Sequence, residues 1–189
     1  AINTANRTVS KHDFNLRFLA PHRATVKKVL QQHELDEAWV YGLIRQESRF
    51  IADIKSHAGA IGLMQLMPST ADWVAKQLGI KNFRLSIISD VNTNLRLGTY
   101  YLKHVLSTLD NQPLLASAAY NAGPGRAKRW RDDYRALEGA IYAETIPFNE
   151  TRDYVKKVLK NSMYYAKVLN HGNGVPTLKE RLGTIAPKP

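Results

Sequence analysis

Hydrophobic residues recur along most of this chain at intervals of three and four, whereas the strict alternation of apolar and polar residues that marks strands is scarce. Intervals of three and four place side chains on one face of a helix. We therefore predict a predominantly all-α fold. The individual helices can be placed from the same pattern together with the residues that typically start and stop helices.

The first third of the chain predicts two helices and a loop. Helical spacing runs from Ser10 to about His33 and is interrupted at Pro21, which predicts a lead-in segment and a first helix. Asp36 is a typical N-cap for a second helix, whose apolar stripe runs toward Phe50. Residues 51–62 contain two glycines and predict a loop.

The middle of the chain predicts two further helices. Pro68 is typical of a helix start, Gly79 would end this helix, and a loop follows at 80–90. After Asp90 the apolar positions predict a long helix, in which the small residue Gly98 marks a close contact with another element.

The last third predicts a buried helix and a long terminal helix. Pro113 opens a nearly all-apolar segment that we expect to be central and to stop at the turn Asn121-Ala-Gly-Pro-Gly. The stretch 126–150 is polar, and we place no helix in it. Thr151 is predicted to cap the last helix, and a tail containing Gly and Pro starts at His171.

Composition narrows the class of protein. The 189 residues are 44% hydrophobic and 23% charged, which fits one globular domain and excludes disordered and collagen-like chains. The absence of Cys excludes disulfides, thiolate metal sites and a cysteine nucleophile. No apolar run approaches the roughly 18 residues of a membrane span, and the N-terminus lacks the apolar core of a signal peptide. Because the chain begins without Met, we expect a processed protein or a fragment.

The charge balance points to a polyanionic partner. The 27 basic and 16 acidic residues give a net charge of +11, spread along the chain with a moderate excess in the last third. Such a diffuse field favours an anionic polymer, and we expect no nucleic acid partner. The six histidines lack the spacings of metal-binding motifs, so we expect no metal and no cofactor.

Glu47 is the first candidate for chemistry. It follows Leu43 by four positions and Ile44 by three, so it shares their apolar helix face. Burial raises a carboxyl pKa, and a carboxylic acid that stays protonated near neutrality can protonate a glycosidic oxygen. A structural alternative stays open, in which Glu47 reaches solvent at the edge of the stripe or pairs with Arg45 or Arg49.

Two glycine-containing segments could accompany it. The stretch 58–71 places two Met and Gln65 beside glycines just before a helix start, which suits a ligand that approaches the backbone. Tyr120 and Asn121 lie beside a glycine turn and offer a flat apolar face and an amide, as a sugar requires. Taken singly, each segment fits a structural role better than a functional one, as a loop, a core tyrosine or a helix C-cap.

The order of four motifs is more specific than any one of them. In sequence they resemble the catalytic domain of the soluble lytic transglycosylases over residues 24–170, and this resemblance implies a lysozyme-like helical domain of the goose type with a substrate cleft. A lead-in segment, 1–23, and a C-terminal tail, 171–189, would flank that domain. The large N-terminal helical domain of full-length members is absent, which implies a part of a longer protein. The four motifs are Glu47-Ser-Arg-Phe, Gly62-Leu-Met-Gln-Leu-Met-Pro-Ser-Thr-Ala, Ala119-Tyr-Asn-Ala-Gly-Pro-Gly and Glu144-Thr-Ile-Pro-Phe-Asn-Glu-Thr-Arg-Asp-Tyr-Val.

The resemblance implies a reaction on peptidoglycan glycan strands. The β-1,4 bond between N-acetylmuramic acid and N-acetylglucosamine would be cleaved without water, which leaves a 1,6-anhydromuramoyl end. Glu47 would act first as the acid and then as the base, and the N-acetyl group of the substrate would replace the second carboxylate of most glycosidases.

The same resemblance assigns further residues. Ser56 would orient the N-acetyl group, and Glu144 would lie on the opposite wall of the cleft, although Glu144 could equally pair with nearby Arg side chains. We expect Ser48 to hold its motif together, and the tyrosines at 154, 164 and 165 to lie in the core. The cleft itself would be lined by Gln65, Met67, Tyr120 and Asn121.

Two other functions stay open at this point. A hydrolytic muramidase on the same fold would need a second carboxylate, for which Asp53, Asp90 or Glu144 could be argued. A module that only binds cell wall or another polyanion would explain the charge but not a glutamate on an apolar face. We expect a monomer in the periplasm, with an association of the full-length protein with the outer membrane left open.

Overall fold

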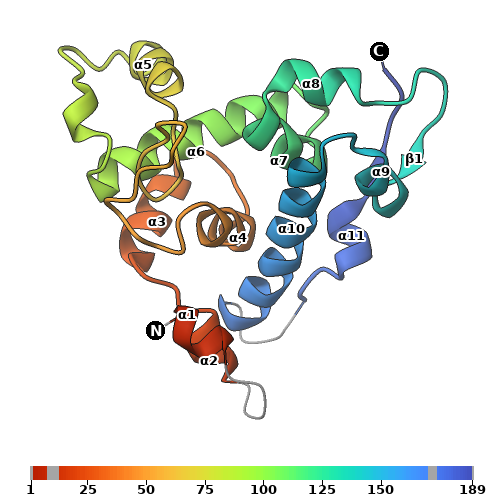
Figure 1. Cartoon of the computed structure of the whole chain (residues 1–189), viewed down its shortest axis with the longest axis horizontal. Helices are drawn as coiled ribbons and strands as arrows, with labels where there is room; N and C mark the ends of the chain where they lie inside the picture. The colour runs from red at the N-terminus through yellow and green to blue at the C-terminus, as the bar shows by residue number, and fades with distance from the viewer. Residues whose placement is uncertain (1, 8–12, 170–173, 189) are drawn as a thin grey trace.

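The computed structural model describes residues 2–7, 13–169 and 174–188, and it is mostly helical, as predicted (Figure 1). Its elements in chain order are α1 (Ile2–Asn6), α2 (Phe14–Arg17), α3 (Arg23–Leu30), α4 (Glu37–Glu47), α5 (Pro68–Gln77), the 3₁₀ helix η1 (Leu85–Ile87), α6 (Val91–Ser107), α7 (Pro113–Ala122), α8 (Pro124–Arg129), β1 (Leu137–Glu138), α9 (Gly139–Thr145), α10 (Asn149–Leu169), α11 (Leu178–Leu182) and β2 (Thr184–Ile185).

Helix α4 lies at the centre of the molecule, where Figure 1 shows it nearly end-on between α3, α6 and α10. The predicted N-cap is confirmed, because the Asp36 carboxylate accepts hydrogen bonds from the backbone N–H of Ala38 (2.7 Å) and of Trp39 (3.2 Å). The main hydrophobic cluster surrounds this helix, and Val40, Tyr41 and Leu43 have no exposed surface. Helix α4 therefore carries Glu47, its last residue, out of the middle of the core.

The contact between α4 and α10 depends on Gly42. A Cβ atom at this position would lie 2.7 Å from the backbone oxygen of Val158 and 2.8 Å from the backbone nitrogen of Ser162. Any larger residue would therefore force the two helices apart. This close approach brings the end of α4 against the first half of α10.

Helix α6 supports the loop that follows α4. Asp90 caps this helix by accepting from the backbone N–H of Thr93 (2.8 Å). The close contact predicted at Gly98 is confirmed, since a Cβ atom there would lie 2.4 Å from Sδ of Met64. The part of the loop around Met64 is thus packed against α6.

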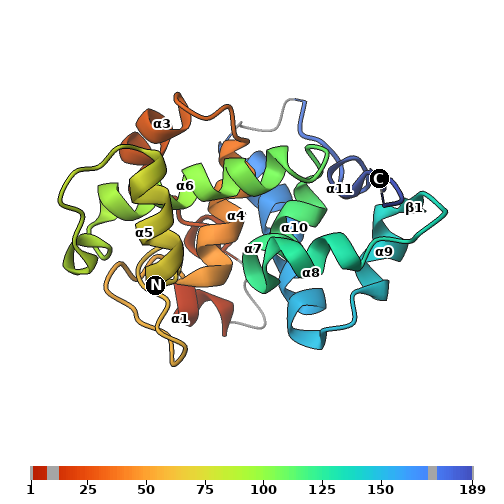
Figure 2. The same cartoon turned by 90° about the horizontal axis from the view of Figure 1, so that it is seen from above.

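Figure 2 shows α5 toward one end of the molecule and α9, α11 and β1 toward the other, with α4, α6, α7, α8 and α10 between them. The end with α5 has its own smaller hydrophobic cluster, made by residues from the loop, from α5 and from α6. Pro68 and Pro113 occupy the first turns of α5 and α7, as predicted. The buried members of the smaller cluster are Leu66, Ala71, Val74, Ala75, Ile88 and Leu97.

Two expectations about helices require correction, and a third is confirmed. The predicted first helix is α3, after the interruption at Pro21, and the lead-in contains the short helices α1 and α2; residues 10–12 lie outside the described residues. The stretch 126–150 contains most of α8 and all of α9, whose short lengths give too few apolar repeats to be recognised. Thr151 is not the cap of the last helix, which begins two residues earlier at Asn149.

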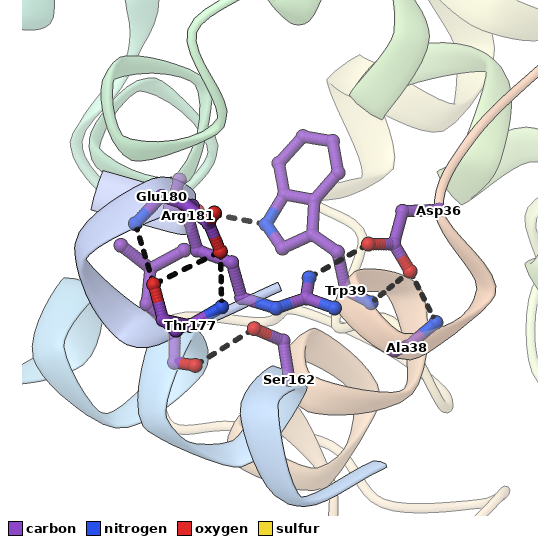
Figure 3. A network of polar contacts seen from close by, with 9 residues as sticks. Asp36, Ala38, Trp39, Ser162, Thr177, Glu180 and Arg181 are labelled. Carbon is purple, nitrogen blue, oxygen red and sulfur yellow. Dashed lines mark hydrogen bonds and ion pairs between the residues drawn. The ribbon is translucent and has the colours of Figure 1, made fainter. Parts of the chain in front are cut away.

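The described part of the C-terminal tail packs against the helices. Strand β2 pairs in antiparallel register with β1, with Ile185 opposite Leu137, and Ile185 is buried. Helix α11 begins with a capping box, which Thr177 and Glu180 form (Figure 3). From α11, Arg181 reaches Asp36, with 2.6 Å between Nη1 and Oδ2. The N-cap of α4 is therefore held by the end of the chain. The predicted tail start, His171, lies outside the described residues.

Candidate active site

The Glu47 side chain faces α10. The hydroxyl of Tyr154 donates a hydrogen bond to its Oε1 atom over 2.5 Å. This contact follows from the approach of the two helices at Gly42, because Tyr154 lies one helical turn before Val158. Tyr154 is buried, as expected of a core residue, and it also touches the candidate acid.

The surroundings of Glu47 favour its protonated form. Burial is the main cause that raises its pKa to about 7, and the negative charge of Glu150 adds to it. The hydrogen bond from Tyr154 acts in the opposite direction, because a donor stabilises the carboxylate. Since burial prevails, a large fraction of Glu47 holds a proton at neutral pH, which confirms the direction predicted from its position on the apolar face.

The described residues do not pair Glu47 with either neighbouring arginine. Arg45 donates to the backbone oxygen of Arg17 and to Oδ1 of Asn6, whereas Arg49 donates to Oδ1 of Asn3. Both guanidinium groups are therefore engaged by the N-terminal part of the chain.

Ser48 shapes the turn that follows Glu47. The next two residues have left-handed backbone angles, with φ of 51° at Arg49 and 66° at Phe50, which side-chain-bearing residues adopt rarely. The Ser48 hydroxyl donates to the backbone oxygen of Ile44 (3.3 Å) and accepts from the backbone N–H of Phe50 (3.1 Å). It thus stabilises the turn, in agreement with the structural role that we predicted.

Tyr120 completes a cluster with Glu47 and Tyr154. Burial raises the pKa of both tyrosines well above the usual value, and in each case the charge of Glu47 raises it further. The hydroxyl of Tyr120 donates to the backbone oxygen of Met64 (2.8 Å). Tyr120 therefore connects α7 to the loop that contains Gln65 and Met67.

The side chain of Asn94 holds that loop in place through hydrogen bonds. This side chain is fully buried in α6, accepts from the backbone N–H of Met64 (2.7 Å) and donates to the backbone oxygens of Ile61 (3.0 Å) and Ile88 (2.9 Å). Three backbone segments are thus held by one amide. The spacing of Asn94, three residues after Val91 and four before Gly98, places it on the apolar face, and this signal could have identified it from the sequence.

Gln65 and Met67 occupy different positions in the loop. Gln65 has a positive φ of 45°, and its amide donates to the backbone oxygens of Gly62 (2.8 Å) and Ile54 (3.2 Å). Met67 precedes α5 and is 41% exposed, which is unusual for a large apolar side chain. The amide of Gln65 is therefore tied to the loop itself, whereas the Met67 side chain is accessible.

Ser56 lies in a small hairpin within the same region. Its Oγ atom accepts from the backbone N–H of Ala60 (3.0 Å), and the backbones of the two residues are also hydrogen-bonded. Because Oγ acts as an acceptor in this contact, the hydroxyl proton of Ser56 can be donated to another group. The neighbouring Asp53 is exposed.

Asn121 and Glu144 are held by different partners. The Asn121 Oδ1 atom accepts from the hydroxyl of Thr151 (2.7 Å), which ties the end of α7 to the first turn of α10. Glu144 is exposed and pairs with Lys156 (2.9 Å), so its partner is a lysine instead of the arginine that we had considered. The structure therefore places Asn121 beside the tyrosine cluster, and it leaves Glu144 on the surface.

The carboxylates considered for a second catalytic role are used elsewhere or exposed. Asp90 caps α6 and Asp53 is exposed. Glu150, which sequence reasoning did not consider, lies one turn before Tyr154 on α10, and its charge acts on Glu47. The described residues contain no group of three His, Cys, Asp or Glu that could hold a metal ion. None of the helices in the described ranges combines the length and the apolarity that a bilayer crossing requires.

Two family matches cover most of the chain. Residues 24–143 match the family described as Transglycosylase SLT domain, and residues 145–174 match the Soluble lytic transglycosylase helical domain. The soluble lytic murein transglycosylase of Escherichia coli K12 is 37% identical over 151 residues, which are 79% of this chain and 23% of that protein. The chain thus spans about a quarter of the length of the curated relatives that it matches.

Solved structures show the same relationship. An inactive mutant of the lytic transglycosylase Slt from Pseudomonas aeruginosa superposes with a TM-score of 0.87 at 39% identity, and the match covers 96% of this chain and 30% of that one. The 70 kDa soluble lytic transglycosylase of Escherichia coli gives a TM-score of 0.78 at 34% identity, over 90% of this chain and 27% of that one. The expected resemblance is therefore confirmed, and the chain belongs to the family of transglycosylase SLT domains.

Proposed function

We propose that this chain is the catalytic domain of a peptidoglycan lytic transglycosylase. It would cleave the β-1,4 bond between N-acetylmuramic acid and N-acetylglucosamine without water and leave a 1,6-anhydromuramoyl end. The observation that carries this proposal is the Glu47 carboxyl, whose pKa is raised to about 7 beside the Tyr154 hydroxyl. Membership of the SLT family and the relatives named as murein transglycosylases support the choice of substrate.

One carboxyl group would perform both proton transfers. Protonated Glu47 would first give its proton to the leaving glycosidic oxygen, and the resulting carboxylate would then take the proton of the muramoyl 6-hydroxyl as the anhydro ring closes. The bond from Tyr154 to Oε1 would stabilise the carboxylate between these steps, and it leaves the other oxygen for the substrate. A pKa near neutrality suits a group that must act in both directions.

We propose that the N-acetyl group of the substrate assists the departure of the leaving group. Ser56 would orient this group through the hydroxyl proton that its contact with Ala60 leaves free. The other walls of the cleft would consist of Gln65, Met67, Tyr120 and Asn121, with Glu144 farther out. The accessible Met67 and the buried tyrosine cluster support a binding surface that is apolar in part and hydrogen-bonding in part.

The proposed substrate and the relatives named as murein transglycosylases support a location in the periplasm. The net charge of +11 supports an anionic polymer as the partner, since peptidoglycan carries peptide carboxylates. The chain would act as a monomer without a cofactor.

Mass spectrometry of the products tests the proposed reaction. Purified peptidoglycan incubated with the chain should yield muropeptides that are lighter by one water than the products of hydrolysis. Products with free reducing ends would support a hydrolytic muramidase instead, for which Glu150 is the carboxylate whose charge reaches Glu47. Binding without any cleavage would support the cell-wall-binding alternative.

A further inference from the structure

A pocket lies between α1, α4 and α10, and it involves none of the residues proposed for glycosidic cleavage. It encloses about 210 Å³. The described residues that line it carry N–H donors, four of them as cations, and no carboxylate is among them. Beside Asn6, the lining consists of Arg45, Gln46, Arg49, Lys157, Lys160 and Asn161.

Arg45 is the fixed part of this pocket. The residue is only 9% exposed, and its guanidinium lies over the ring of Phe18 at 4.5 Å from the centroid. It donates to two neutral acceptors, the backbone oxygen of Arg17 and Oδ1 of Asn6, and it is also hydrogen-bonded to the Tyr165 side chain. Burial lowers the pKa of Arg45, the contact with the Tyr165 side chain raises it, and the charges of Arg49 and Arg17 lower it further. A buried cation among other cations is costly unless an anion joins it.

The two lysines are available to a ligand. Lys157 makes only a loose contact with Asp153 on its own helix, at 3.9 Å, and both side chains are more than half exposed. Lys160 is exposed and has no ion-pair partner among the residues that the structure describes. Both lysines project from the same side of α10, three residues apart, so their ammonium groups can reach one ligand.

We propose that this pocket binds an oxyanion, either a phosphate or a carboxylate group. Arg45 would provide a pre-oriented planar donor, and Arg49, Lys157 and Lys160 would close around the charge with hydrogen bonds from ammonium and guanidinium groups. The amides of Gln46 and Asn161 supply further donors at the rim. A free phosphate and the carboxylate of a peptide offer the same chemistry, and the experiment distinguishes these two sources.

The test is a titration followed by NMR on the 189-residue chain at constant ionic strength. Inorganic phosphate is one probe, and N-acetyl-D-alanyl-D-alanine, compared with its C-terminal amide, is the other. Saturable shifts of the side-chain amides of Gln46 and Asn161 support the pocket. Saturation with phosphate assigns a phosphate ligand, and saturation with the peptide acid but not with its amide assigns a carboxylate.

Variants locate the binding. Lys160→Gln and Lys157→Gln should each weaken it about threefold or more, whereas Lys167→Gln, which removes an equal charge from the same helix away from the pocket, should not. An equal loss in all three variants, or shifts that do not saturate with either probe, would overturn the proposal. The Glu47→Gln chain should bind the anion unchanged, so failure of the proposed reaction and failure of this site are separate results.

Discussion

Tyr154 donates a hydrogen bond of 2.5 Å to Oε1 of Glu47, and this contact joins the end of α4 to the first half of α10. Two opposing effects act on the pKa of Glu47 at this contact. Burial raises the pKa of Glu47 to about 7, while the phenol hydroxyl holds the pKa below the value that burial alone would produce. The pair therefore sets how the candidate acid responds to pH and to substitution.

Glu47→Gln should abolish turnover and preserve the fold. The amide has the same shape as the acid but can neither give nor take a proton, and the loss of a positioned acid and base costs about 10²–10⁴ in rate or more. The release of anhydro-ended muropeptides measures the effect, with circular dichroism as the control for folding. A rate within a few-fold of that of the wild type would remove Glu47 from the mechanism.

The same substitution should stabilise the protein above neutral pH. The folded-state pKa of Glu47 is raised, so between the ordinary glutamate value of 4.5 and about 7 the unfolded chain loses this proton while the folded chain keeps it. The stability contributed by Glu47 is therefore complete below 4.5 and is lost as the pH rises through 7. From pH 4 to pH 8, the free energy of unfolding of Glu47→Gln should therefore rise by about 3 kcal/mol relative to that of the wild type. Urea unfolding at several pH values checks this, and a constant difference from pH 4 to pH 8 would contradict it.

Tyr154→Phe should shift the pH profile of the enzyme. Without the donor the carboxylate of Glu47 is less stable, so the pKa of Glu47 rises and the alkaline limb of kcat/KM moves to higher pH. The maximal rate should fall about tenfold, because the carboxyl also loses an orienting partner. Tyr164→Phe, on the same helix but without a contact to Glu47 among the described interactions, is the matched control. If the alkaline limb moves equally in both variants, Tyr154 does not determine the pKa of Glu47.

Ser56→Ala compared with Asp53→Asn and Asp90→Asn distinguishes a lyase from a hydrolase. If the substrate N-acetyl group assists the reaction, Ser56→Ala should reduce turnover strongly, though less than Glu47→Gln. The Ser56 variant loses the alignment of the N-acetyl group but keeps the proton transfer by Glu47. The two aspartate variants should remain active, since Asp90 serves as an N-cap that Asn can replace and Asp53 is exposed. An inactive aspartate variant beside an active Ser56→Ala chain would reverse this assignment.

Asn94→Ala should destabilise the fold by about 2–4 kcal/mol, because it leaves several buried backbone groups without partners. Asn92→Ala, two residues away on the exposed side of α6, should change the stability much less. The midpoint of urea unfolding compares the two. Similar midpoints for both variants would show that the loop at 61–66 does not depend on this amide.

The sequence predicted the features that depend on local chemistry. The caps at Asp36 and Asp90, the helix starts at Pro68 and Pro113 and the close packing at Gly98 all follow from one residue and its near neighbours. Features that depend on distant contacts were missed or misplaced. Thr151 looked like an N-cap because its type is typical of one, but its hydroxyl is directed at Asn121 on another helix.

The candidate site shows the same difference between features that depend on local chemistry and features that depend on distant contacts. The apolar stripe of α4 was enough to predict that the pKa of Glu47 would rise, since burial depends on the face of the helix. The partner Tyr154 could not be found in this way, because its place on α10 looks like that of any core tyrosine. Only the approach of the two helices at Gly42 determines which tyrosine reaches the carboxyl.

Glu47 and Tyr154 are 107 positions apart in the chain. During synthesis α4 leaves the ribosome well before α10 exists, and until then the glutamate meets water and has the acidity of an ordinary carboxyl. Closing a loop of this length is among the slow steps of folding. Glu47 therefore becomes able to donate a proton at neutral pH only when α10 docks, late in folding. A nascent or truncated chain that ends before α10 would accordingly be inert toward the wall polymer, whatever the state of its first helices.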